Sequence, residues 1–64
     1  MMRTIEADWL KLLEPAVDQY WDELSAFEQK FIENILARFK KYGSRTFVST
    51  KEWGVIALIS EKVL

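Results

Sequence analysis

Apolar residues recur every three or four positions through three stretches of the chain, which is the spacing of a helix with one buried face. The clearest stretch runs from Ser25 to about Tyr42. Its apolar row consists of Phe27, Phe31, Ile35, Phe39 and Tyr42, widened by Ile32 and Leu36. Similar rows cover residues 4–23 and 49–63. The pattern therefore predicts an all-α fold, a small domain of three helical segments.

Two capping boxes mark where the second and third helices begin. Ser25 is followed three residues later by Glu28, and Ser49 by Glu52. In this motif the serine oxygen accepts from the later backbone amide, and the glutamate carboxylate accepts from the serine amide. Gly43 follows the middle segment and can adopt the positive φ that often ends a helix. We expect a loop over residues 43–48.

Two features leave alternatives open. Pro15 removes an amide donor and clashes with the preceding helical turn, so the first helix either kinks there or stops near Leu13 and restarts. In the last segment, β-branched residues allow a rival β-hairpin that pairs residues 45–48 with residues 55–58. The capping box and the length of the segment favour the helix.

The chain has 64 residues, which is room for one domain spanning 1–64. A chain this short buries only about 60% of the surface of its unfolded form. Without cysteine it has no disulfide to compensate for a thin core, which leaves aromatic packing or association. The apolar rows predict the core residues Trp9, Leu13, Tyr20, Leu24, Phe27, Phe31, Ile35, Phe39, Trp53, Ile56 and Ile59.

The composition offers little for catalysis. There is no histidine and no cysteine, so the usual nucleophile–base pairs and the strongest zinc ligands are absent. No glycine-rich phosphate loop or calcium loop occurs. We expect a non-enzymatic protein with no cofactor and no metal site. A membrane span needs roughly 20 apolar residues. The longest nearly apolar run, residues 53–59, is far shorter, so we expect a soluble, cytoplasmic protein with no membrane partner.

Charge and surplus apolar side chains suggest a surface for a protein partner. Residues 1–24 carry a net charge of −4 and residues 25–64 a net charge of +3. Glu14, Asp18 and Asp22 are spaced by four, so we expect them to share one face of the first helix. This face is either simply solvated, a contact for a basic partner or, less readily, a metal site. Several apolar residues also exceed what the core needs, as in interaction sites. The predicted partner-binding residues are Trp21, Val55, Leu58, Glu14, Asp18 and Asp22.

A basic cluster supports an alternative function. The cations lie near the end of the second helix, in the loop and at the start of the third helix, with Tyr42 and Phe47 between them. Such side chains contact phosphates, and exposed aromatic rings stack on bases. The candidate nucleic-acid-binding residues are Arg38, Lys40, Lys41, Arg45 and Lys51. A pI near 5.3 argues against strong non-specific binding.

The run Leu-Ser-Ala-Phe-Glu-Gln-Lys-Phe-Ile at residues 24–32 is followed by Ser49, Lys51 and an aliphatic ladder up to Lys62. Through these residues, the stretch 24–62 resembles a two-helix module common in phage and prophage proteins. This chain departs from the pattern at Ala57 and Leu58, where polar residues are usual, and at Glu52, where glutamine is usual. The resemblance implies a mobile-element origin and no catalytic residue.

These observations lead to one main functional hypothesis. We expect a phage or prophage accessory protein, located in the host cytoplasm, that covers a surface of another protein, for example as an inhibitor of a host defence or nucleic-acid-processing complex. The nucleic-acid-binding module is the first alternative. A self-associating structural protein, such as a homodimer, is the second.

Overall fold

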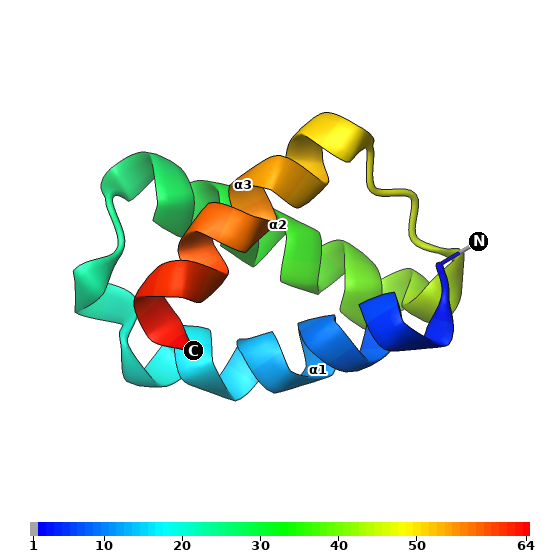
Figure 1. Cartoon of the computed structure of the whole chain (residues 1–64), viewed down its shortest axis with the longest axis horizontal. Coiled ribbons are helices and arrows are strands. Elements are labelled where there is room, and N and C mark those ends of the chain that lie inside the picture. Colours follow the sequence, from blue (N-terminus) through cyan, green and yellow to red (C-terminus); the bar gives the residue numbers. More distant parts are fainter. Residues whose placement is uncertain (1) are drawn as a thin grey trace.

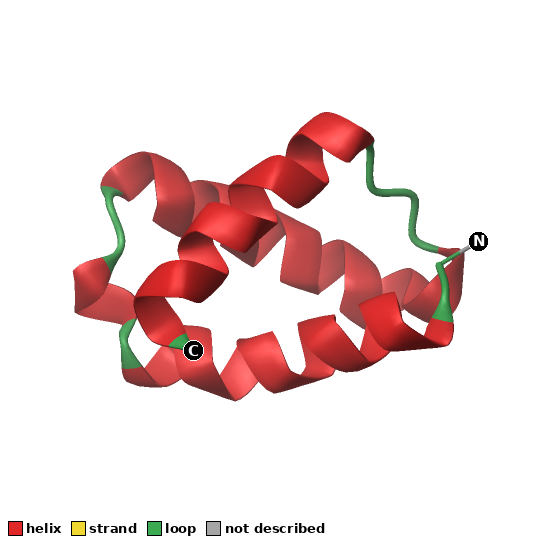
Figure 2. Ribbon diagram, in the orientation of Figure 1, coloured by secondary structure: helices red, strands yellow, loops and turns green. Residues whose placement is uncertain are grey.

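The computed structural model describes residues 2–64, which form three α-helices connected by two 3₁₀ turns (Figure 1; Figure 2). Helix α1 spans Thr4–Gln19, α2 spans Ala26–Tyr42 and α3 spans Thr50–Val63, with the turns η1 at Trp21–Glu23 and η2 at Gly43–Arg45. No strand occurs among the described residues. The predicted all-α fold is therefore confirmed, and the alternative β-hairpin is wrong.

Both capping boxes form as predicted. The Ser25 hydroxyl accepts from the Glu28 amide at 3.2 Å, and the Glu28 carboxylate accepts from the Ser25 amide at 2.8 Å. Ser49 and Glu52 repeat this exchange at 3.2 and 3.0 Å. Helix α2 ends at Gly43, whose positive φ lies in the region that favours glycine.

Helix α1 runs without interruption through Pro15, so of the two alternatives the stop near Leu13 is wrong. Pro15 lies on an exposed face, where water can bond to the Lys11 carbonyl that loses its helical partner. The kink stays a prediction. The helix ends at Gln19, which is earlier than expected. Tyr20 is its C-cap and has a non-helical backbone conformation.

The three helices pack against one another, with α3 lying across α1 and α2 (Figure 1). The start of the described chain lies beside the α2–α3 connection, where the Met2 amide donates to the Ser44 carbonyl at 2.8 Å. Within residues 2–64, no helix combines the length and apolar character needed to cross a bilayer.

The core is mainly aliphatic. Its buried apolar residues are Leu10, Leu13, Val17, Leu24, Ile32, Ile35, Ile56, Ile59 and Val63. The predicted core was right for Leu13, Leu24, Ile35, Ile56 and Ile59. Trp9, Phe31, Phe39 and Trp53 are partly buried and pack against this core. The prediction was wrong for Tyr20, at the end of α1, and for Phe27, both of which are exposed.

The error at Phe27 follows from helix geometry. Residues four apart are separated by about 400° of rotation, so a row at that spacing drifts about 40° per step. From Phe27 to Phe39 the drift reaches about 120°. The row therefore cannot stay on one buried face, and the core side of α2 is centred on Ile32 and Ile35 instead. Phe27 lies at the solvent end of this drift.

Polar contacts between helices fix the packing. Trp9 of α1 stacks on Trp53 of α3 with 5.2 Å between ring centroids, and its indole N–H donates to the Ser60 hydroxyl at 2.9 Å. The Lys62 ammonium of α3 donates to the Glu28 carboxylate of α2 at 2.7 Å. Glu28 therefore caps one helix and attaches the end of another, so it has a structural role.

Candidate functional site

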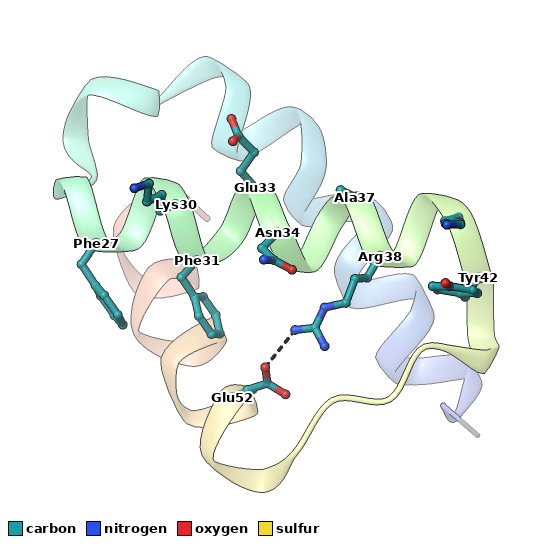
Figure 3. Close-up of a pocket in the computed structure, with 10 residues that line it drawn as sticks. Phe27, Lys30, Phe31, Glu33, Asn34, Ala37, Arg38, Tyr42 and Glu52 are labelled. Carbon is teal, nitrogen blue, oxygen red and sulfur yellow. Dashed lines mark hydrogen bonds and ion pairs between the residues drawn. The ribbon is translucent and has the colours of Figure 1, made fainter.

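An open groove follows the outer side of α2 and reaches the first turn of α3 (Figure 3). All of its lining residues except Glu52 come from α2 and recur at helical spacing along the helix. The groove is lined by Phe27, Lys30, Phe31, Glu33, Asn34, Ala37, Arg38, Lys41, Tyr42 and Glu52. We call this set of residues the α2 groove.

Aromatic rings lie at both ends of the α2 groove. At one end Phe27 is 67% exposed and stacks on the partly buried Phe31, with 6.1 Å between ring centroids. At the other end Tyr42 is 53% exposed, and the Lys41 ammonium lies 5.3 Å from its ring centroid. Ala37 between them adds only a methyl group to the wall. The groove therefore offers aromatic contact area at two points separated by about four helical turns.

One wall of the groove is an ion pair between α2 and α3. The Arg38 guanidinium donates to the Glu52 carboxylate at 2.8 Å (Figure 3). The Ser49 amide and then Arg38 stabilise this carboxylate in its charged form, so the pKa of Glu52 is lowered. The Arg38 Nε is buried and has no acceptor among the described residues. Arg38 thus connects two helices and is not a free cation.

The free positive charges of the groove belong to two lysines. Among residues 2–64, the ion pairs use Arg3, Arg38 and Lys62 as cations, which leaves the exposed Lys30 and Lys41 ammonium groups without a carboxylate partner. With the Arg38–Glu52 pair neutralised, the remaining opposite charge in the lining is Glu33. The groove therefore has a small positive excess.

The predicted apolar partner residues do not form one exposed patch. Trp21 is partly buried against the core, and its backbone carbonyl accepts from the Gln29 side chain at 2.9 Å. Val55 is also partly buried against the core. Leu58 is 58% exposed on α3. Of the three, only Leu58 offers a largely free side chain.

The predicted acidic row is split by the end of α1. Glu14 and Asp18 are exposed on α1, whereas Asp22 lies in the separate turn η1. The expectation that all three share one helix face is therefore wrong. Glu14 and Asp18 border a shallow depression between α1 and α2 that also includes Lys40. In the part of the chain that the structure describes, no three acidic side chains converge in a metal-binding arrangement.

Most of the predicted basic cluster is exposed. Lys40, Lys41, Arg45 and Lys51 all reach solvent at the α2 end, in η2 and at the start of α3. Only Arg38 is not free to bind a phosphate, because its guanidinium is paired with the Glu52 carboxylate. The cluster thus overlaps the α2 groove at Arg38 and Lys41 and extends beyond it.

The sequence reasoning missed the groove because it assigned Phe27 and Phe31 to the core and gave Lys30 no role. The sequence did contain a signal for the groove, because a row of residues four apart rotates around the helix and leaves the buried face. Ile32 and Ile35 are three apart and define a second, aliphatic face that competes with the aromatic one. In this structure the aliphatic face is buried, and Phe27 at the far end of the aromatic row is exposed.

No protein-family model, no curated protein and no solved structure matches this chain. The resemblance to the phage module therefore stays a prediction. Several residues that carry it, including Ser25, Glu28, Ser49 and Lys62, form caps or an inter-helix ion pair here. A pattern built from such residues specifies how two helices pack and does not specify a function.

Proposed function

We propose that this chain is a non-catalytic binding domain that recognises another protein through the α2 groove. The observation that carries the proposal is the exposure of Phe27, a large aromatic side chain, next to Phe31 on the open side of α2. Exposed apolar surface of this kind, bordered by polar groups, is typical of protein-binding sites. Aromatic side chains are also over-represented among the residues that dominate binding energy.

The chemistry of the chain supports binding over catalysis. It contains neither histidine nor cysteine, and three of its serines have structural roles. The hydroxyls of Ser25 and Ser49 accept capping hydrogen bonds, while Ser60 accepts from Trp9 and donates to the Ile56 carbonyl at 2.8 Å. A serine nucleophile needs a free hydroxyl beside a base. These three hydroxyls are committed to the fold.

The shape of the groove suits an extended or helical segment of a partner. Phe27 and Tyr42 are fifteen residues apart, which corresponds to about 22 Å along the helix axis. Helical peptides commonly bind such grooves through apolar side chains three, four and seven residues apart. The groove replaces the surface predicted from the sequence, because Trp21 and Val55 are largely engaged by the core.

A matched pair of variants tests this proposal. Phe27→Ser removes the exposed ring of the groove, and Leu12→Ser removes a side chain of nearly equal exposure, 66%, on α1. In capture experiments from lysate of the native cell, we expect Phe27→Ser to lose bound protein and Leu12→Ser to retain it. Equal capture by both variants, with folding verified by circular dichroism, would contradict the proposal.

A second candidate function is nucleic-acid binding by the basic cluster. The favouring observation is Phe47, which is 76% exposed in the loop between η2 and α3, with Arg45 and Lys51 nearby in sequence. Thr46 anchors that loop, because its buried hydroxyl donates to the Gly43 carbonyl at 2.7 Å. An exposed ring among cations is the arrangement that stacks on single-stranded bases.

Two pairs of substitutions separate the two candidates. Lys40→Glu with Lys41→Glu should weaken retention of a single-stranded oligonucleotide at about 50 mM salt if the basic cluster binds phosphates. Arg45→Glu with Lys51→Glu should do the same without changing the α2 groove. Absence of oligonucleotide binding by the unmodified chain would remove this candidate.

We also propose a phage or prophage origin, a cytoplasmic location and a role as an inhibitor of a host complex. Self-association is the third functional candidate. Sedimentation at two protein concentrations separates it from the others, since a mass that rises with concentration indicates contact between copies.

A further inference from the structure

We propose that the occupant of the α2 groove is an amphipathic helix of a partner protein that carries two acidic side chains eleven residues apart. This inference rests on the proposed function and adds the chemistry of the partner. It is carried by the placement of Lys30 and Lys41, the two groove cations without a carboxylate partner among the described residues.

The spacing of the two lysines sets the spacing of the partner's charges. They are eleven residues apart on α2, which is about 16 Å and almost three full helical turns. A partner helix that lies nearly along α2 has the same rise per residue. Carboxylates at positions i and i+11 of that helix would therefore lie on one face and reach both ammonium groups.

The lining between the lysines is mixed, and its apolar members, Phe31 and Ala37, can contact apolar side chains of such a helix. Ala37 leaves room for close approach, and Phe31 presents a partly buried ring beside Phe27. Leucine-type residues at positions i+4 and i+7 of the partner would lie between its two acids, over this part of the groove. The partner would thus bury its apolar stripe while its acids contact the groove ends.

A second copy of this groove is a poor occupant. A symmetric dimer places the same patch of two copies face to face, with the two α2 helices either antiparallel or parallel. In the antiparallel pair Lys30 of one copy would lie opposite Lys41 of the other, because the two residues are placed nearly symmetrically about the middle of the groove. In the parallel pair each lysine would lie opposite its counterpart in the other copy. Juxtaposed like charges oppose association.

A nucleic-acid strand also fits the groove poorly. Its phosphates follow one another every few ångströms along the axis, so about four or five would pass between the two lysines. Over that distance the groove offers no further free cation among the described residues, and the Glu33 carboxylate belongs to its lining. The two cations of the groove match two widely spaced acids better than a continuous row of phosphates.

A charge-swap experiment tests the inference. The probe is a designed peptide of about 18 residues, long enough to form a helix, with glutamate at positions i and i+11 and leucine at i+4 and i+7. Two matched peptides replace both glutamates by glutamine or by lysine. Backbone amide shifts of residues 27–42 report binding in the groove. Fluorescence anisotropy at about 50 mM salt, where screening is weak, gives the affinity.

We expect the glutamate peptide to bind in the groove about tenfold more tightly than the glutamine peptide, because it gains two charge pairs. Lys30→Glu with Lys41→Glu should weaken the glutamate peptide by a similar factor and reverse the preference in favour of the lysine peptide. Circular dichroism establishes that this variant is folded. The reversal is a readout that loss of folding cannot produce.

Four outcomes would overturn the inference. Equal binding of the three peptides in the groove would refute the acidic partner while leaving the α2 groove as a protein-binding site. Failure of all peptides to shift residues 27–42 would refute the inference, whereas the proposed function is decided separately by the Phe27→Ser and Leu12→Ser comparison. A free chain that dimerises through the groove, or an oligonucleotide that shifts the groove amides, would assign the site to another occupant.

Discussion

The orientation of α2 can be tested by replacing one residue on each of its two apolar faces with alanine. Ile32 is fully buried in the core, whereas Phe27 is largely exposed at the end of the α2 groove. The aromatic row in the sequence predicts that Phe27 is the more important of the two. The structure predicts the opposite. Ile32→Ala and Phe27→Ala therefore measure directly which face of the helix points inward.

The expected effects differ enough to be resolved. Ile→Ala substitutions in a core typically cost about 2–5 kcal/mol, because they remove transfer free energy and leave a cavity. Domains of this size have total stabilities of about 3–10 kcal/mol, at about 0.05–0.15 kcal/mol per residue. For Phe27 only a third of the side chain is buried, which amounts to roughly 50–80 Å² and at most about 2 kcal/mol. The higher helix propensity of alanine offsets about 0.5 kcal/mol of this loss of stability.

Urea unfolding provides the measurement. The fluorescence of Trp9 and Trp53, which stack on one another between α1 and α3, should report the global transition. We expect Ile32→Ala to lower the free energy of unfolding by about 2 kcal/mol or more, or to leave the chain unfolded. Phe27→Ala should lower it by about 1 kcal/mol or less. A larger loss for Phe27→Ala than for Ile32→Ala would refute the placement of α2.

Three further predictions concern the polar contacts. Trp9→Phe removes the indole donor to α3 and should cost about 0.5–1.5 kcal/mol in the same urea assay; an unchanged midpoint would contradict a role for that bond. Ser25→Ala removes a helix cap and should cost about 1 kcal/mol, whereas Ser44→Ala, at an exposed serine that caps no helix, should be neutral, and equal effects of the two would count against the cap. In the folded chain the pKa of Glu28 is lowered mainly by Lys62, and the pKa of Glu52 mainly by the Ser49 amide. The contribution of both carboxylates to the stability of the fold is therefore complete above the ordinary pKa of 4.5, and it is lost as the pH falls below that value. The thermal midpoint should therefore drop in acid, and a Glu28→Gln/Glu52→Gln variant should show a smaller drop; an identical drop in that variant would contradict this assignment.

Local features of the fold were predictable because their causes lie within a few residues. The exchange between Ser25 and Glu28 involves positions three apart, and Gly43 ends α2 through its own backbone freedom. These signals placed the start and end of α2 and the start of α3 correctly. They depend on helix geometry alone and do not require knowledge of which elements become neighbours.

Contacts between distant segments were not predictable in the same way. Glu28 was assigned a cap from the sequence, but its ion pair with Lys62 joins residues 34 apart. Arg38 was assigned to a nucleic-acid surface, yet it is paired with Glu52 because α3 begins beside the groove (Figure 3). Tertiary packing decides which charges stay free, and a single sequence does not show that packing.

The candidate site was hidden by the same limitation. Phe27 belongs to an apolar row that reads as core, and its exposure became visible only once α1 and α3 were placed against Ile32 and Ile35. The sequence nevertheless indicated correctly that apolar surface exceeds what a small core can cover. The apolar residues predicted to bind a partner were Trp21, Val55 and Leu58, of which the structure leaves only Leu58 largely free.

The most direct measurement is photo-crosslinking from inside the α2 groove. A benzophenone-bearing phenylalanine analogue at position 27, compared with the same analogue at Leu12 as a control of nearly equal exposure, reports which face contacts a partner in the native cell. We expect an adduct from position 27 and none from position 12. An adduct from position 12 alone would show that the partner binds α1 and that the α2 groove is not the binding site.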